Sequence, residues 1–296
     1  MKKIICWWSG GITSAVACKI AIDLYGVENV RVIFIDTKNE HVDTYRFMAD
    51  CSVWYQKDIE VITGIGEKYK SIQDVWRRWN SLNVASGAVC SSELKREVRE
   101  KWQKENEYTH QVFGFDLDEP KRVKAMKLNH QKAKPIFPLW LHGYSKEDCI
   151  KIVSDSGIEI PKMYQLGFRN NNCFGVSEES IGGCVQGGIG YWQKMKRDFP
   201  LKFDKMAEEE HLLTDRKGSP VTMLRLSKKK DDEKRIPLFL KPHPKYPNLP
   251  NLKDQKGREP EPLFECNGFC GTNDLEKRKE TENELNFYGE LFPNIK

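Results

Sequence analysis

Apolar runs typical of buried strands alternate with helical patterns from the N-terminus to about Pro138. The expected strands cover residues 4–8, 30–35, 59–63 and 111–115. The expected helices cover residues 13–25, 42–55, 72–79, 91–104 and 119–130. This alternation predicts an α/β fold with a doubly wound, mostly parallel sheet. Ligands of such sheets bind at the carboxyl ends of the strands, so we expect the functional residues there.

The change of pattern after Pro138 divides the chain into three expected segments. An α/β domain covers 1–142, and a helical subdomain with a cysteine-bearing Gly/Asn-rich turn covers 143–200. An irregular, proline-rich C-terminal extension covers 201–296.

Within the later segments, helices are expected over 145–156 and 191–197. Seven of the fourteen prolines fall between Pro237 and Pro262, which excludes regular helix there. The segment from Ser227 to Pro262 also has too little apolar patterning to dock by itself.

The composition is that of a globular chain, with 296 residues of which 39% are hydrophobic. A net charge of +5 permits an anionic partner without requiring one. The apolar run over residues 4–8 is too short for a signal peptide or a membrane span, so we expect a cytoplasmic protein with no membrane partner. The nine cysteines therefore favour metal binding or redox chemistry over a disulfide framework. The oligomeric state stays open.

The segment Ser9-Gly10-Gly11-Ile12-Thr13-Ser14, here called loop 9–14, joins the first expected strand to the first expected helix. Its backbone N–H groups and the positive helix end form a site suited to an anion such as a phosphate. The two glycines permit close approach, and the hydroxyls of Ser9, Thr13 and Ser14 add uncharged donors. The loop has neither the lysine of a Walker loop nor the glycine spacing of a Rossmann fingerprint. An ordinary strand-to-helix turn is the alternative interpretation.

Loop 9–14 resembles the pyrophosphate-binding loop, SGGxDS, of the N-type ATP pyrophosphatases. Further motifs in the same order are similar to the phosphoadenosine phosphosulfate reductase family within that group. These motifs are Phe34 to Glu40 with Thr44 beyond it; Gly114, Glu119 and Arg122 in GFDLDEPKR; and Pro138-Leu139 followed by Tyr164, Gly167 and Cys173. The resemblance covers roughly residues 4 to 190. It departs at Thr13, where most adenylating members have Asp, and at Phe115-Asp116, where the family's first Arg would stand.

The resemblance implies a PP-loop nucleotide-binding domain over 1–142 that binds ATP or a related adenine nucleotide. The implied nucleotide-binding residues are Ser9, Gly10, Gly11, Thr13, Ser14, Asp36, Thr37, Gly114 and Arg122. Asp36 at the end of the second strand can accept a hydrogen bond from a ribose hydroxyl or hold Mg²⁺. Arg122 can neutralise phosphate charge. Asp36 as a helix N-cap and Arg122 on a solvated helix face are the alternatives.

Cysteines in Gly/Asn-rich turns suggest a metal site. Cys173, Cys184, Cys266 and Cys270 suffice for a tetrahedral Zn²⁺, which we favour, or for an iron–sulfur cluster. Free thiols or a redox pair are the alternative. Cys6, Cys18 and Cys149 fall in strand or helix patterns and are expected in the core.

Cys90 precedes an expected helix that Ser91 or Ser92 could cap, and a helix N-terminus lowers the pKa of a thiol. The resemblance places Cys90 near a segment of sulfonucleotide reductases that pairs a catalytic cysteine with a lysine, here Lys95. A buried, inert Cys90 is the alternative. Trp76 and Trp79 flank two arginines and could stack bases, although their spacing also fits a core.

Three functions follow from these features. The first, which the resemblance implies, is an enzyme that activates a sulfur-carrier or nucleic-acid substrate by adenylation with release of pyrophosphate. The second is a sulfonucleotide reductase with a cysteine nucleophile. The third is a nucleotide-binding module without turnover, which Thr13 in the loop favours.

Overall fold

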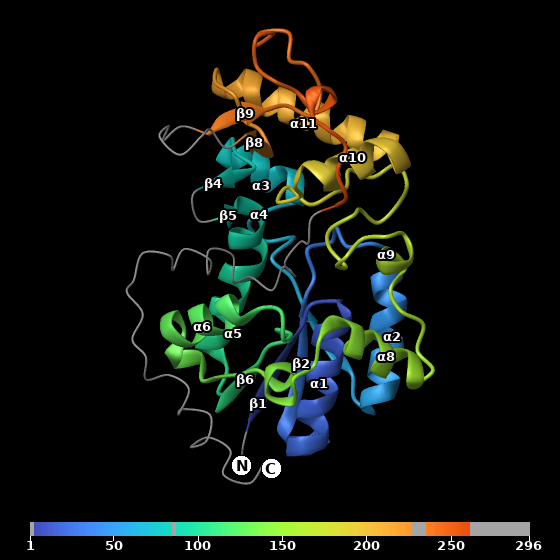
Figure 1. Cartoon of the computed structure of the whole chain (residues 1–296). Coiled ribbons are helices and arrows are strands. Elements are labelled where there is room, and N and C mark those ends of the chain that lie inside the picture. The colour runs from blue at the N-terminus through green and yellow to red at the C-terminus, as the bar shows by residue number, and fades with distance from the viewer. Residues whose placement is uncertain (1–2, 85–86, 227–234, 261–296) are drawn as a thin grey trace.

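The computed structural model describes residues 3–84, 87–226 and 235–260 of the chain (Figure 1). Its main element is a five-stranded sheet in the order β3-β2-β1-β6-β7, and every neighbouring pair is parallel. The strands are β1 Ile4–Trp8, β2 Val30–Ile35, β3 Ile59–Ile62, β6 His110–Val112 and β7 Pro135–Ile136. The prediction of an α/β fold with a parallel sheet is confirmed. The two-residue strand β7 was not predicted.

The helices fit the predicted alternation, with boundaries that shift by one or two residues in most cases. They are α1 Ile12–Tyr25, α2 Asp43–Tyr55, α3 Ile72–Trp79, α4 Val89–Ser91, α5 Glu97–Glu105, α6 Pro120–Asn129, α7 Pro138–His142, α8 Lys146–Asp155, α9 Lys162–Gln165, α10 Ile189–Asp198 and α11 Pro200–Lys217. A π-helical turn, η2 Ser92–Arg96, joins α4 to α5. Single-turn helices complete the described elements: η1 Val27–Asn29, η3 Gln131–Ala133 and η4 Leu252–Asp254.

The inner strands β1 and β2 are buried on both faces, which explains why they read as almost continuous apolar runs. Successive side chains of a strand point to opposite faces. In β1, Cys6 therefore packs in the core with α1, α2 and α8, whereas Trp7 packs in a separate core with α5 and α6. Helices on both faces make the sheet doubly wound, as predicted (Figure 1).

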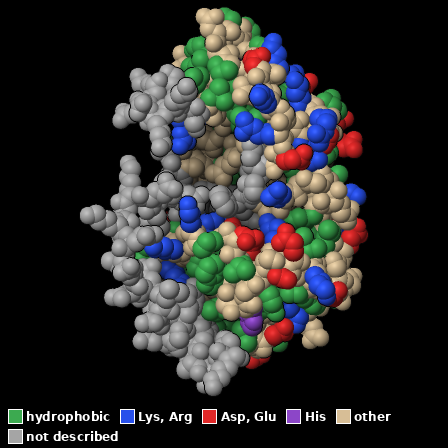
Figure 2. Space-filling model, viewed as in Figure 1, with side chains coloured by type: hydrophobic (Ala, Val, Ile, Leu, Met, Phe, Trp, Pro, Cys, Tyr) green, Lys and Arg blue, Asp and Glu red, His purple; other side chains and the backbone are tan. Residues whose placement is uncertain are grey.

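A third, larger core lies beyond the sheet and forms what we call the upper lobe (Figure 1). It combines α3 and α4 with α10 and α11 from much later in the chain. Two hairpins complete it: β4 Asn83–Val84 with β5 Gly87–Ala88, and β8 Leu224–Leu226 with β9 Ile236–Leu238. Figure 2 shows that the molecule is hollowed between this lobe and the sheet.

The expectation of an irregular extension from residue 201 is wrong for its first part, because α11 runs over Pro200–Lys217. Pro200 stands at the first turn of the helix, where a proline is tolerated rather than disruptive. Phe203, Met206, Ala207, Glu210, Leu213 and Thr214 are buried at helical spacing. This periodicity is obscured in the sequence by the many charged residues between the apolar positions.

The expectation that the segment from Ser227 to Pro262 cannot dock by itself is also wrong for its described part. Leu238, Phe239, Leu240 and Leu252 are all at most 2% exposed. Leu238, Leu240 and Leu252 join the core of the upper lobe. A few large apolar residues between prolines therefore suffice to anchor an irregular chain.

The described cysteines and tryptophans separate into core and surface positions. Cys6, Cys18 and Cys149 are buried, as predicted. Burial raises the pKa of the Cys18 thiol well above its usual value, which keeps it neutral. Trp76 is fully buried and Trp79 is half exposed, so the two rings do not form a shared surface on which bases could stack.

None of the helices in the described part of the chain combines the length and the apolar character that crossing a membrane requires.

Candidate functional site

Loop 9–14 begins where β1 ends and passes directly into α1. Gly10 has a φ of +85°, a backbone conformation that favours glycine, and Gly11 is the N-cap of α1. The Ser14 hydroxyl accepts from the Ser9 N–H at 3.0 Å and donates to the Gly11 carbonyl at 2.9 Å. The two serines therefore brace the loop from within.

Gly10 and Gly114 both lie so close to neighbouring residues that a side chain would not fit. A Cβ atom on Gly10 would lie 2.9 Å from Cγ2 of Thr44, at the start of α2. A Cβ atom on Gly114 would lie 2.6 Å from the backbone N and Cα of Ser14. Gly114 follows β6, the strand next to β1, so the loop rests on the chain that leaves the neighbouring strand.

The N-terminus of α1, a helix of 14 residues, carries the partial positive charge of the helix dipole. No acidic residue lies in its first turn. Its N-cap is a glycine, which has no side chain to occupy the N–H groups of that turn. The Tyr164 hydroxyl accepts from the Ile12 N–H at 3.2 Å. This arrangement suits an anion at the start of α1.

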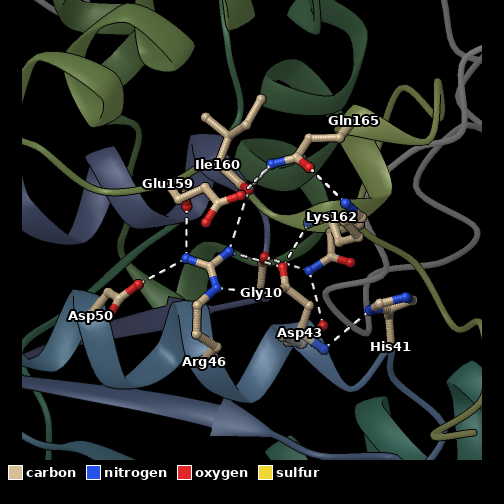
Figure 3. Close-up of polar contacts among 11 residues, drawn as sticks. Gly10, His41, Asp43, Arg46, Asp50, Glu159, Ile160, Lys162 and Gln165 are labelled. Atoms are coloured by element: carbon tan, nitrogen blue, oxygen red, sulfur yellow. Dashed lines mark hydrogen bonds and ion pairs between the residues drawn. The ribbon is translucent and has the colours of Figure 1, made fainter.

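A polar network joins α2 to the start of α9, the short helix that carries Tyr164 (Figure 3). The Arg46 guanidinium pairs with Asp43 and Asp50 and donates to the carbonyls of Glu159 and Ile160. Asp43 in turn accepts from the backbone N–H of Lys162, the first residue of α9, at 2.6 Å. Arg46 and Asp43 therefore fix the short helix that carries Tyr164.

Asp36 lies at the carboxyl end of β2, as predicted, and is fully buried. Its carboxylate accepts from the Tyr45 hydroxyl at 3.1 Å and from the backbone N–H of Lys38 at 2.7 Å, and it pairs with the Lys38 ammonium at 2.9 Å. Burial and the nearby Asp36 carboxylate raise the pKa of the Tyr45 phenol. The N-cap of α2 is Val42, so the alternative role of Asp36 as the cap of α2 is wrong.

Thr37, at the end of β2, begins a chain of side-chain contacts that includes Glu40, Lys95 and Cys173. Its hydroxyl donates to Glu40 at 3.0 Å and lies 3.7 Å from the sulfur of Cys173. Glu40 pairs with the Lys95 ammonium at 3.3 Å, and both side chains are buried. The expected nucleotide-binding Thr37, the expected base Lys95 and the expected metal ligand Cys173 thus belong to one chain of contacts.

Arg122 lies on the opposite side of loop 9–14 from Asp36, because β6 and β2 flank β1 on opposite sides. It is 4% exposed, which excludes the alternative of a solvated face. Its guanidinium pairs with Glu119 and lies 4.2 Å from the centroid of the Phe115 ring. Phe115, the residue after Gly114, supports Arg122 by a cation–π contact.

Cys90 is 9% exposed and belongs to the core of the upper lobe. The predicted cap by Ser91 or Ser92 is wrong, because the helix begins at Val89 with Ala88 as its N-cap and without a side-chain cap. The helix follows directly on β5 and begins two residues before the predicted range 91–104.

Of the four cysteines predicted to bind a metal, Cys173 and Cys184 lie in described segments and both are partly buried. Burial raises the pKa of the Tyr191 phenol, and the thiols of Cys184 and Cys173 add to this rise. The Tyr191 hydroxyl also accepts from the Cys184 N–H at 3.0 Å.

Cys266 and Cys270 lie outside the described residues. The chain that leads toward them runs along α10, where the Arg258 N–H donates to Gln193 at 3.0 Å. A Cβ atom on Gly190 would lie 2.0 Å from the Glu259 carbonyl oxygen. Within residues 3–84, 87–226 and 235–260, no group of three or more His, Cys, Asp or Glu side chains is arranged to hold a metal ion.

Sequence reasoning missed a group of asparagines beside the loop. Asn171 donates to the Gly10 carbonyl at 2.8 Å and to the Thr44 hydroxyl at 3.0 Å. Asn172, the next residue in the sequence, is also buried. Asn39 is buried as well, in the segment after β2 whose backbone bonds to Phe174 and Gly175. The only available signal was the run Asn170-Asn171-Asn172, which was interpreted as a turn for Cys173.

Comparison with known proteins gives a family and distant similarities to solved structures. A family model described as the phosphoadenosine phosphosulfate reductase domain matches residues 3–178. The phosphoadenylyl-sulfate (PAPS) reductase from Candida auris, solved as a phosphate complex, is 16% identical with a TM-score of 0.42; 58% of this chain and 82% of that chain are covered. The U34-tRNA thiolase NcsA from Methanococcus maripaludis, solved with its 4Fe-4S cluster, is 13% identical with a TM-score of 0.32, and 72% of each chain is covered.

No curated protein matches the chain significantly. The family model nevertheless spans more than half of the sequence, including loop 9–14, Asp36, Gly114 and Cys173. The chain therefore belongs to the phosphoadenosine phosphosulfate reductase family.

Proposed function

We propose that this protein is an enzyme that binds ATP or a close analogue with its phosphates on loop 9–14. In this proposal it activates an acceptor by adenylation and releases pyrophosphate. The observation that carries it is the start of α1, which is reached through Gly10 and Gly11, is braced by Ser9 and Ser14, and rests on Gly114. A positive helix end without a capping side chain or an acidic first turn suits a polyphosphate.

The proposed chemistry is displacement at the α-phosphorus. An acceptor oxygen forms a bond to this atom while the bond between the α-phosphorus and the bridging oxygen breaks, and the electron pair leaves with pyrophosphate. The backbone N–H groups of loop 9–14 stabilise the charge that develops on the departing group. Arg122, held by Glu119 and Phe115, approaches from the β6 side and neutralises phosphate charge.

The Asp36 carboxylate is the kind of oxygen ligand that Mg²⁺ prefers. It pairs with the Lys38 ammonium at 2.9 Å and would hold Mg²⁺ in place of this ammonium. Mg²⁺ supplies charge neutralisation to the phosphates when it is bound. Thr13, which is buried in the loop, contributes no carboxylate to such a site.

The acceptor in this proposal is a sulfur carrier or a nucleic acid. The chain's positive net charge of +5 is compatible with either and selects neither.

Reduction of a sulfonucleotide is the second candidate, favoured by the position of Cys173 beside Thr37 at the carboxyl end of β2. A thiolate attacks the sulfate sulfur, forms a sulfur–sulfur bond to it and expels the nucleotide through its phosphate oxygen. A second thiol then releases sulfite as a disulfide forms. Cys173 fits this role better than Cys90, which belongs to the core of the upper lobe.

We also propose that Cys173, Cys184, Cys266 and Cys270 bind one Zn²⁺, with an iron–sulfur cluster as the alternative. One observation supports this: the chain toward the second pair passes Gly190, six residues after Cys184. Four thiolates complete a tetrahedral shell, and their binding energy contributes to folding.

Incubation with ATP labelled at the α- or γ-phosphate separates the candidate functions. Labelled pyrophosphate and an adenylated acceptor support the proposed reaction, whereas sulfite from an added sulfonucleotide supports the second candidate. Saturable nucleotide binding without either product identifies a binding module. Absence of both binding and product contradicts the proposal.

A further inference from the structure

Three buried asparagine side chains beside loop 9–14 carry polar atoms without a hydrogen-bond partner. Asn39 is 5% exposed, Asn171 is 4% exposed and Asn172 is 3% exposed. The unmatched donors are Nδ2 of Asn39 and Nδ2 of Asn172. The unmatched acceptors are Oδ1 of Asn171 and Oδ1 of Asn172.

These amides belong to one junction between two loops. The Asn39 carbonyl accepts from the N–H groups of Phe174 at 3.0 Å and Gly175 at 2.9 Å, which binds the end of β2 to the loop that follows α9. Asn171 reaches from this junction to the Gly10 carbonyl at 2.8 Å. The unmatched amides are therefore next to the loop that holds the phosphates in the proposed function.

Burying a polar group without a partner destabilises a folded protein. Native proteins contain few such groups, so four unmatched atoms at one junction require an explanation. A ligand that supplies the missing partners explains why the cluster is retained. Its position against Gly10 and Thr44 places that ligand at the candidate site rather than elsewhere on the surface.

The chemistry of the unmatched atoms restricts the ligand. An anion such as sulfate offers acceptors only, so it satisfies Asn39 Nδ2 and Asn172 Nδ2 but leaves both acceptors unmatched. A cation satisfies only the acceptors. A nucleobase edge presents donors and acceptors side by side, and asparagine pairs with adenine in this way through two hydrogen bonds.

We propose that Asn39, Asn171 and Asn172 recognise the edge of a nucleobase. This inference rests on the proposed function, because it takes the neighbouring loop 9–14 to be the phosphate site. The base is either the adenine of the nucleotide bound there or a base of a nucleic-acid acceptor.

Calorimetric titration of the full-length protein with ATP, tripolyphosphate and a single-stranded oligonucleotide of mixed sequence tests this assignment. Asn172→Leu replaces the amide with an apolar side chain of similar size, and Asn172→Ala removes it without added bulk if the first variant fails to fold. We expect about tenfold weaker ATP binding and unchanged tripolyphosphate binding, as for the loss of buried hydrogen bonds.

The arms of the titration separate the two sources of the base. A loss confined to the oligonucleotide shows that the cluster recognises an acceptor base. Unchanged affinity for both ATP and the oligonucleotide overturns the proposal. If the wild-type protein binds neither ATP nor tripolyphosphate, the proposed phosphate site fails, and the oligonucleotide still tests the asparagines.

Thermal unfolding without ligand provides a second readout. Asn172→Leu removes two unmatched buried atoms, so its Tm is expected to stay the same or rise, while the increase in Tm on adding ATP becomes smaller. The matched control is Asn251→Leu, which removes a buried amide that is bonded to Asp254 at 2.7 Å and Lys253 at 3.2 Å. The control is expected to lower the Tm and to leave ATP binding unchanged. A Tm for Asn172→Leu that falls as far as that of the control would show that Asn172 is already satisfied, and would overturn the proposal.

Discussion

A Cβ atom on Gly114 would lie 2.6 Å from the backbone nitrogen of Ser14. This close approach holds the start of α1 against the chain that follows β6, so two neighbouring strands of the sheet fix the position of loop 9–14. The same contact explains why a glycine far from the loop in sequence belongs to the candidate site.

Gly114→Ala is expected to weaken nucleotide binding, because the added methyl group pushes the backbone at Ser14 away from its position. The free energy of unfolding is expected to fall by about 1 to 3 kcal/mol, the usual scale for overpacking. Titration with ATP and urea unfolding measure the two effects. Gly257→Ala is the control, since nothing lies within 4 Å of a Cβ atom there. Equal behaviour of the two variants would show that Gly114 does not support the loop.

Asp36→Asn is expected to weaken binding of Mg²⁺-ATP by about 1 to 3 kcal/mol, as for loss of a charged partner. Tyr45→Phe is the matched control because it removes the 3.1 Å hydrogen bond to Asp36 and keeps the carboxylate. The control is expected to lose stability but to retain its affinity for Mg²⁺-ATP. If both variants bind like the wild type, Asp36 has a structural role only.

Glu210 is expected to make the stability of the upper lobe depend on pH. Burial raises the pKa of its carboxyl to about 8, although the N–H groups of Leu240 and Met223 oppose this rise. The folded state then binds more protons than the unfolded state between the ordinary carboxyl pKa and about 8. The contribution of Glu210 to the free energy of unfolding is therefore full at acid pH and is lost as the pH rises through this window.

Urea unfolding at several pH values between 5 and 8 measures this dependence. The wild-type protein should lose stability relative to Glu210→Gln as the pH rises, because glutamine does not titrate. A difference between the two proteins that stays constant over this range would contradict the prediction.

Protein purified without oxygen is expected to contain about one zinc per chain, as four thiolates would bind. Cys184→Ser should lower this content, and Cys149→Ser should not, because Cys149 is buried in the core beside the sheet. Elemental analysis provides the measurement. Iron with matching sulfide would favour the cluster, and wild-type protein without either metal would refute a shared site.

Local patterns were sufficient to predict the sheet and loop 9–14. β1 and β2 are buried on both faces and so appear as apolar runs, and the two glycines mark the turn into α1. α11 was missed because charged residues hide its buried positions. The two-residue strand β7 is too short to give a pattern.

The candidate site was only partly predictable, because some of its contacts join distant parts of the chain. The pairing of Lys95 with Glu40 joins η2 to the segment after β2, and the bond from Asn171 to Gly10 joins residues 161 positions apart. Neither has a signature in local sequence. The burial of Cys90 likewise depends on helices of the upper lobe that follow it much later in the chain.

Calorimetric titration of Gly10→Val with Mg²⁺ and a non-hydrolysable ATP analogue tests the central claim most directly. Gly143→Val is the control: both glycines have positive φ, +85° and +68°, but a Cβ atom meets Thr44 only at Gly10 and open space at Gly143. Gly10→Val is expected to remain folded and to lose detectable binding, while Gly143→Val is expected to bind like the wild type. Unchanged affinity in a folded Gly10→Val protein would show that loop 9–14 is an ordinary turn and not a phosphate site.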